Sequence, residues 1–60
     1  MHRMKIKLYD IVKLVSGETA CIVHIYEQGV AYEADIDTLN GKTLTDTIFQ
    51  EQIASVISCK

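Results

Sequence analysis

Evenly spaced turn signals constrain the fold of this chain more than any other feature. Its three glycines occupy positions 17, 29 and 41, each twelve residues from the next. Turn residues that recur every ~8–12 positions are typical of small all-β sandwiches and barrels. The segments between the glycines are rich in valine, isoleucine, threonine and tyrosine, residues that favour strands. The sequence therefore predicts an all-β protein.

A chain of 60 residues has room for one domain and little more. We expect a single domain over residues 1–60, in which 1–6 are either frayed or form an extra strand. A deep pocket of ~300 Å³ needs walls that so short a chain can hardly supply. We therefore predict a protein that is not an enzyme and that needs no cofactor.

The absence of a long apolar run predicts a protein without a membrane span, which would need ~20 such residues. The charged N-terminal segment does not have the pattern of a signal peptide, so we expect a cytoplasmic protein. Cys21 and Cys59 would then be free thiols, although their spacing leaves a single disulfide open.

Five strands and one short helical turn are expected between the turn signals. The chain should bend near Tyr9 and Asp10, because continued alternation would bury the Asp10 carboxylate. Five strands with a helical turn before the last one is the element order of a small SH3-like barrel, so we predict that fold. We place the strands at residues 10–15, 19–26, 30–36, 43–49 and 53–58, and the helical turn at 50–52.

The clearest alternation predicts that Val30, Tyr32, Ala34 and Ile36 face the core. Asn40-Gly41 is a strong hairpin signal, because both residues tolerate the positive φ of a two-residue turn. That turn pairs Ala34 with Thr47 and Tyr32 with Phe49. It also sets Asp35 against Asp46, a like-charge pair that is unfavourable. Either the loop is longer than two residues, or the repulsion is tolerated in water or used in binding.

Five segments resemble the short bacterial proteins of domain of unknown function 4926. They are residues 7–12, 20–26, 32–36, 40–44 and 49–53. The resemblance covers residues 7–57 and implies an SH3-like barrel, but it assigns no chemistry. The chain departs from the family pattern at Ala20, where glycine is usual, and at Gln50, where proline is common.

Acidic side chains form the leading candidate site. Glu33, Asp35 and Asp37 alternate along one expected strand, so they share its outward face, and Asp46 is expected to join them from the next strand. Such a surface suits a basic protein partner. A calcium site is the weaker alternative, because the spacing of Asp35, Asp37 and Asn40 is out of step with a calcium loop. We predict no metal.

The aromatic and sulfur-bearing residues suggest two further sites, both less favoured than simple packing. Three tyrosines beside Glu27 and Glu33 could form an aromatic cage for a methylated side chain, provided that their rings converge. Zinc could in principle be bound by Cys21, His24, Cys59 and His2, and Cys21 and His24 could form a nucleophilic pair. Positions 21 and 24, however, face opposite sides of a regular strand.

The uneven charge distribution bears on the choice of partner. Residues 1–13 carry four basic residues and one acid, whereas 14–60 carry two basic residues and seven acids. An acidic body repels the phosphate backbone of nucleic acids. We therefore expect a protein-interaction module, an accessory or neutralising partner of another bacterial protein. The alternative is a small nucleic-acid-binding barrel that uses Arg3, Lys5, Lys7 and Tyr9. A homo-oligomer, formed through sheet edges or apolar faces, is also open.

Overall fold

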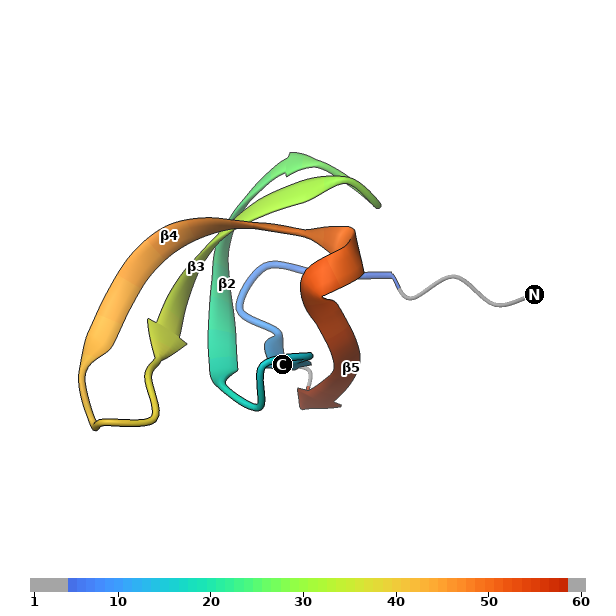
Figure 1. Cartoon of the computed structure of the whole chain (residues 1–60). Coiled ribbons are helices and arrows are strands. Elements are labelled where there is room, and N and C mark those ends of the chain that lie inside the picture. The colour runs from blue at the N-terminus through green and yellow to red at the C-terminus, as the bar shows by residue number, and fades with distance from the viewer. Residues whose placement is uncertain (1–4, 59–60) are drawn as a thin grey trace.

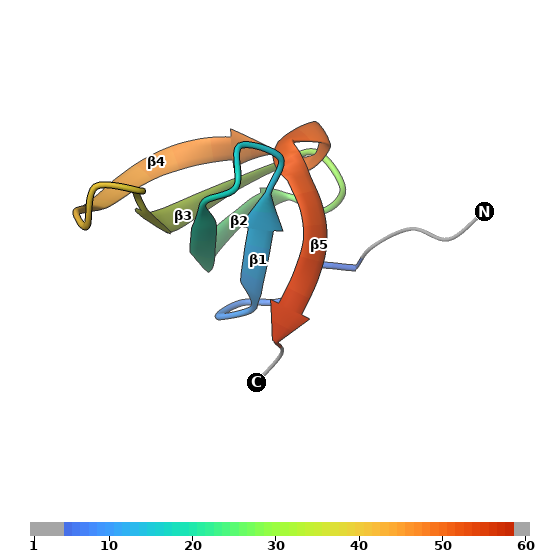
Figure 2. The ribbon, with the colours of Figure 1, turned by 60° about the horizontal axis from the view of Figure 1, so that its bottom comes forward.

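The computed structural model describes residues 5–58, whose strands form one antiparallel sheet (Figure 1). The order across the sheet is β4-β3-β2-β1-β5, as Figure 2 shows. The prediction of an all-β protein with a helical turn before the last strand is confirmed. The elements are β1 (Ile11–Leu14), β2 (Thr19–Glu27), β3 (Ala31–Asp37), β4 (Thr43–Phe49), the 3₁₀ helix η1 (Gln50–Gln52) and β5 (Ile53–Ser58).

The sheet is bent, and β4 and β5 are its two edge strands (Figure 2). The helix η1 joins these two strands in the chain. The Gln50 N–H donates to the carbonyl of Val30 (2.9 Å), and the Val15 N–H donates to the carbonyl of Gln52 (2.8 Å). η1 therefore connects the turn before β3 with the end of β1. Within residues 5–58 no helix is long and apolar enough to cross a membrane.

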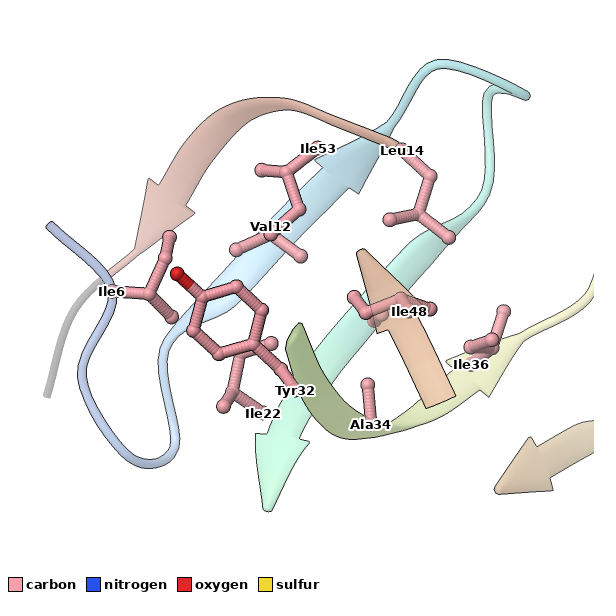
Figure 3. Close-up of a cluster of buried hydrophobic side chains, with 10 residues drawn as sticks. Ile6, Val12, Leu14, Ile22, Tyr32, Ala34, Ile36, Ile48 and Ile53 are labelled. Carbon is pink, nitrogen blue, oxygen red and sulfur yellow. The ribbon is translucent and has the colours of Figure 1, made fainter. Parts of the chain in front are cut away.

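One apolar core fills the inner side of the bend, and all five strands contribute to it (Figure 3). Residues 1–4 lie outside the described part, so the prediction for residues 1–6, a frayed segment or an extra strand, can be compared with the structure only at residues 5 and 6. Neither belongs to a strand, and Ile6 packs in the core. The core side chains are Ile6, Val12, Leu14, Ala20, Ile22, Tyr32, Ala34, Ile36, Ile48 and Ile53.

Tyr32 carries the largest fully buried side chain, and its hydroxyl group is fully used. It donates to Oε1 of Gln50 at 2.5 Å and accepts from the Gly29 N–H at 2.8 Å. Tyr32, Ala34 and Ile36 face the core as predicted. Val30 does not, because β3 begins one residue later and Val30 lies half exposed in the turn.

The predicted bend before β1 is present, but the prediction that it keeps Asp10 out of the core is wrong. Tyr9 has a φ of +69°, which turns the chain sharply. The turn does not expel Asp10, which is only 1% exposed. One carboxylate oxygen, Oδ2, accepts the Lys7 N–H at 2.9 Å, and among the described residues Oδ1 has no hydrogen-bond partner. The buried carboxylate therefore stabilises the turn through its hydrogen bond to Lys7.

Irregularities in β2 change which of its side chains share a face. The pairing with β3 shifts between Ile22 and His24, and again between Ile25 and Glu27. Cys21 consequently lies opposite Asp35, and His24 lies opposite Glu33. The prediction that Cys21 and His24 face opposite sides is wrong, because a β-bulge adds one residue between them.

The β3–β4 hairpin has a three-residue loop, so the predicted two-residue turn is wrong and the longer loop is confirmed. The Thr38 N–H donates to the Lys42 carbonyl (2.8 Å), and the Gly41 N–H donates to the Thr38 carbonyl (3.0 Å). Gly41 has a φ of +88°, the left-handed conformation that glycine adopts without strain. This loop moves the register of β4 by one residue.

The new register changes which side chains of β4 face inward. Tyr32 pairs with Ile48, which is buried, whereas Phe49 pairs with Ala31 and is half exposed. The prediction that Phe49 lies against Tyr32 on the inner face is therefore wrong. A shift of one residue exchanges the two faces of a strand, because successive side chains alternate.

Candidate functional site

The face of the sheet opposite the core carries the predicted acidic residues, and we call it the outer face. Because Tyr32, Ala34 and Ile36 point into the core, the alternate residues of β3 point away from it. Glu33, Asp35 and Asp37 therefore form a row of carboxylates along β3. Three threonines of β4 stand beside them, Thr47 opposite Glu33, Thr45 opposite Asp35 and Thr43 opposite Asp37.

Hydroxyl groups, which are neutral, donate to each of these three carboxylates. Thr45 Oγ1 donates to Asp35 at 2.6 Å, and Thr43 Oγ1 donates to Asp37 at 3.2 Å. The hydroxyl of Tyr26 donates to Oε1 of Glu33. These bonds orient the carboxylates without cancelling their negative charge.

Tyr26 and His24 extend the outer face at the Glu33 end. Their rings meet edge to face, with centroids 4.8 Å apart and planes at 73°. The hydrogen bond to Glu33 favours the protonated phenol and so raises the pKa of Tyr26 above its ordinary value; the negative charge of Glu33 acts in the same direction. Regular alternation places Tyr26 with Ala20 on the core side, and only the bulges of β2 bring it to this face.

Among the described residues, the one lysine or arginine that strand pairing places on the outer face is two strands away from the acidic row. Asp37 pairs with Thr19, and Thr19 pairs in turn with Lys13 of β1. Neighbouring strands are ~4.8 Å apart, so Lys13 starts about 10 Å from Asp37. Among the described side chains, no lysine or arginine donates a hydrogen bond to the acidic row, and its negative charge lies at the surface.

Asp46 does not lie with the other acids. It pairs with Ala34, whose side chain is buried, so Asp46 stands on the inner side of β4. Its side chain remains exposed because the core does not extend across this part of the strand, and its Oδ1 accepts the Thr47 N–H at 2.8 Å. The structure brings together Glu33, Asp35 and Asp37 and separates Asp46 from them.

The register also bears on the metal alternatives. Asp46 and Asp35 lie on opposite faces, so they cannot jointly hold a calcium ion. In the part of the chain that the structure describes, no three histidine, cysteine, aspartate or glutamate side chains are grouped closely enough to hold a metal ion. Cys21 forms no disulfide, and Cys59 lies outside the described residues.

The aromatic side chains do not converge as a cage would require. Tyr32 is buried and its hydroxyl is bonded, whereas Tyr9 lies in the turn before β1. Tyr26 contacts His24 on the outer face. The structure therefore does not form the aromatic cage, the less favoured alternative, because the rings are divided between the core, a loop and the sheet surface.

The basic segment of the nucleic-acid alternative precedes β1. Lys5, Lys7 and Tyr9 are all exposed, and Arg3 lies outside the described residues. No strand forms at positions 5–9, where the chain forms a loop and a turn. The exposed Tyr9 follows the two exposed lysines in the sequence.

No protein-family model, no curated protein and no solved structure matches the chain. The resemblance to domain of unknown function 4926 therefore stays a prediction from the sequence, and the function has to be argued from the surfaces of the molecule itself.

Proposed function

We propose that this chain is a non-enzymatic protein-interaction module with an SH3-like barrel fold, an accessory or neutralising partner of another protein. The strand order β4-β3-β2-β1-β5 and the 3₁₀ turn before β5 support the fold. The resemblance to domain of unknown function 4926 is consistent with this proposal.

The binding surface in this proposal is the outer face, and its ligand is a basic protein surface. The observation that carries the proposal is the row of Glu33, Asp35 and Asp37, to which only hydroxyl groups donate among the described side chains. Threonine and tyrosine hydroxyls hold the carboxylates in place, so little side-chain freedom is lost when a partner binds. Complementary charge would speed association and select the partner.

Capture from a lysate of the source organism tests the proposal. The wild-type chain and an Asp35→Asn/Asp37→Asn variant would be immobilised in parallel, and the retained proteins identified by mass spectrometry. Asparagine keeps an oxygen that accepts the threonine hydrogen bond, so the substitution removes charge and preserves shape. We expect a specific basic partner on the wild type and at least about tenfold less of it on the variant, since close charge pairs contribute ~1.5 kcal/mol or more.

A Glu18→Gln/Glu51→Gln variant is the matched control, because it removes the same charge from other parts of the surface. It should retain the partner. The proposal fails if the wild type captures no specific protein, or if both double variants lose the partner equally.

Nucleic-acid binding is the second candidate, favoured by an exposed Tyr9 that follows the exposed Lys5 and Lys7 in the sequence. An aromatic ring can stack on an unpaired base while lysines contact phosphates. Fluorescence anisotropy with single-stranded DNA and RNA at ~50 mM salt tests it, since such binding weakens steeply as salt rises. Tyr9→Ala should weaken any binding observed, and the absence of binding at that salt concentration would remove this candidate.

A further inference from the structure

β4 is an edge strand whose hydrogen-bonding groups are partly unpaired. Figure 1 shows β4 along one side of the sheet, with its hairpin loop far from β5. All its side chains except Ile48 are exposed, including Leu44 at 53%. An open edge of this kind is a template for pairing with another strand.

The hydrogen bonds divide the N–H groups of β4 into two sets. The Lys42 carbonyl accepts the Thr38 N–H. By alternation, the backbone groups that point toward β3 are those of Lys42, Leu44, Asp46 and Ile48. The alternate residues direct theirs toward the open edge. Thr47 and Phe49 confirm this assignment, because their N–H groups donate to side chains, Oδ1 of Asp46 and Oε1 of Gln52, at 2.8 Å each.

The same bonds leave only part of the edge available. Thr47 and Phe49 are already capped, whereas Thr43 and Thr45 are the positions on β4 whose outward N–H groups have no such cap among the described side chains. Strand pairing is therefore directed to the half of β4 next to the hairpin loop.

We propose that two copies of this chain pair antiparallel along β4, about a twofold axis that passes through Leu44. In this register Thr43 of each copy exchanges two backbone hydrogen bonds with Thr45 of the other. The two open N–H groups of each copy are then both used, and the two sheets join into one.

The side chains on the inner side of the strand match in the same register. Leu44 meets its own symmetry mate across the axis, which covers two half-exposed apolar side chains. Asp46 of one copy lies directly opposite Lys42 of the other, and this pair occurs twice. Opposite charges facing each other across a pair of strands are favourable.

The registers displaced toward η1 are less favourable. Antiparallel pairing must match residues whose backbone groups point toward the open edge, so the sum of two paired residue numbers changes in steps of two and the twofold axis moves by one residue. An axis at Thr45 sets Leu44 against Asp46 and requires the capped N–H of Thr47. An axis at Asp46 places two aspartates together. The register about Leu44 therefore avoids both a charge conflict and a broken cap.

Sedimentation velocity at several concentrations tests the proposal on the purified chain, independently of any partner at the outer face. We expect the wild type to form a dimer as its concentration rises. Lys42→Glu sets two acids face to face and Asp46→Lys sets two lysines face to face, so each variant alone should dimerise about tenfold more weakly. A 1:1 mixture of the two variants should dimerise again, because every facing pair in the mixed dimer has opposite charges.

Two control variants carry the same changes in net charge at other places. Lys7→Glu and Glu51→Lys should each dimerise as the wild type does. The proposal is overturned if the wild type is monomeric up to ~1 mM, if the mixture associates no better than its components, or if the controls lose association to the same extent.

Discussion

Asp10 and Tyr26 show at the scale of single residues how the surroundings of a side chain decide its role. Asp10 is the buried polar residue among those described, and its carboxylate holds the Lys7 N–H. Tyr26 is exposed, but its hydroxyl is engaged by Glu33. The first side chain stabilises a turn, and the second orients part of the proposed binding surface.

The Tyr26 phenol should respond to the charge of Glu33. Glu33→Gln keeps an acceptor oxygen but removes the charge, so the pKa of Tyr26 should fall toward its ordinary value. Titration of the Tyr26 ring carbon signal by NMR measures this change. Because the folded-state pKa of Tyr26 is raised, the stabilisation is present below the pKa of an unfolded tyrosine, ~10, and is lost as the pH rises through the folded value. An unchanged pKa of Tyr26 in the variant would show that the charge of Glu33 does not contribute to the raised value.

The buried Asp10 carboxylate should matter as an acceptor. Asp10→Ala removes the partner of the Lys7 N–H and should lower the free energy of unfolding by about 1–3 kcal/mol. Asp10→Asn retains an acceptor oxygen and should cost less. Urea denaturation measures both variants. If the alanine variant is as stable as the wild type, the side chain does not hold the turn.

The β3–β4 hairpin shows at the scale of elements how one loop residue decides a register. The three-residue loop ending in Gly41 sets Asp35 against Thr45 and avoids the predicted clash with Asp46. The same loop determines that Asp46 lies on the inner side of the strand. The acidic row, the threonine row and the proposed dimer pairs all depend on it.

Gly41 should tolerate only residues that accept its backbone conformation. No atom lies within 4 Å of a Cβ added there, so the cost of Gly41→Ala comes from the positive φ alone. We expect that substitution to lower the free energy of unfolding by about 1–2 kcal/mol. Gly41→Asn should cost less, because asparagine visits this conformation more readily. Urea denaturation separates the two, and equal stabilities would contradict the strain.

The Tyr32 hydroxyl should hold η1 against the turn before β3. Tyr32→Phe leaves Oε1 of Gln50 and the N–H of Gly29 without this partner, and should cost about 1–3 kcal/mol of stability. Tyr26→Phe is the matched control, because its hydroxyl is at the surface; it should change stability much less than Tyr32→Phe does. Thermal and urea unfolding compare the variants. A cost as small for Tyr32 as for Tyr26 would mean that the buried network contributes little.

The whole molecule combines an acidic outer face with an open edge, and the two proposals concern different parts of it. Pairing of two copies along β4 would join their outer faces, so that the two rows of carboxylates lie on the same face of a single sheet, separated by the two β4 strands. A dimer would then present its basic partner with twice the negative charge.

Self-association should also be visible in thermal stability. A partner that binds only the folded state stabilises it, so the melting temperature of the wild type should rise with protein concentration. A domain of this size should gain up to about 4 °C for each tenfold increase above the dissociation constant. Lys42→Glu should show little such dependence. A melting temperature equally independent of concentration in both chains would contradict the dimer.

The sequence by itself determined the number, type and approximate bounds of the elements, because these depend on local properties. Evenly spaced glycines mark the turns, and β-branched residues favour the strands between them. The bounds predicted for β4, η1 and β5 agree with those observed. The outward row of Glu33, Asp35 and Asp37 also followed from simple alternation along β3.

Only the tertiary structure decided how the strands are placed against each other. The register of β4 against β3, the bulges in β2 and the burial of Asp10 each depend on how the strands pack against one another. Alternation cannot reveal them, because a single extra residue in a loop or bulge exchanges the two faces of everything that follows. That is why Asp46 lies on the inner side of β4 and not with the other acids, and why Tyr26 lies on the outer face and not on the core side.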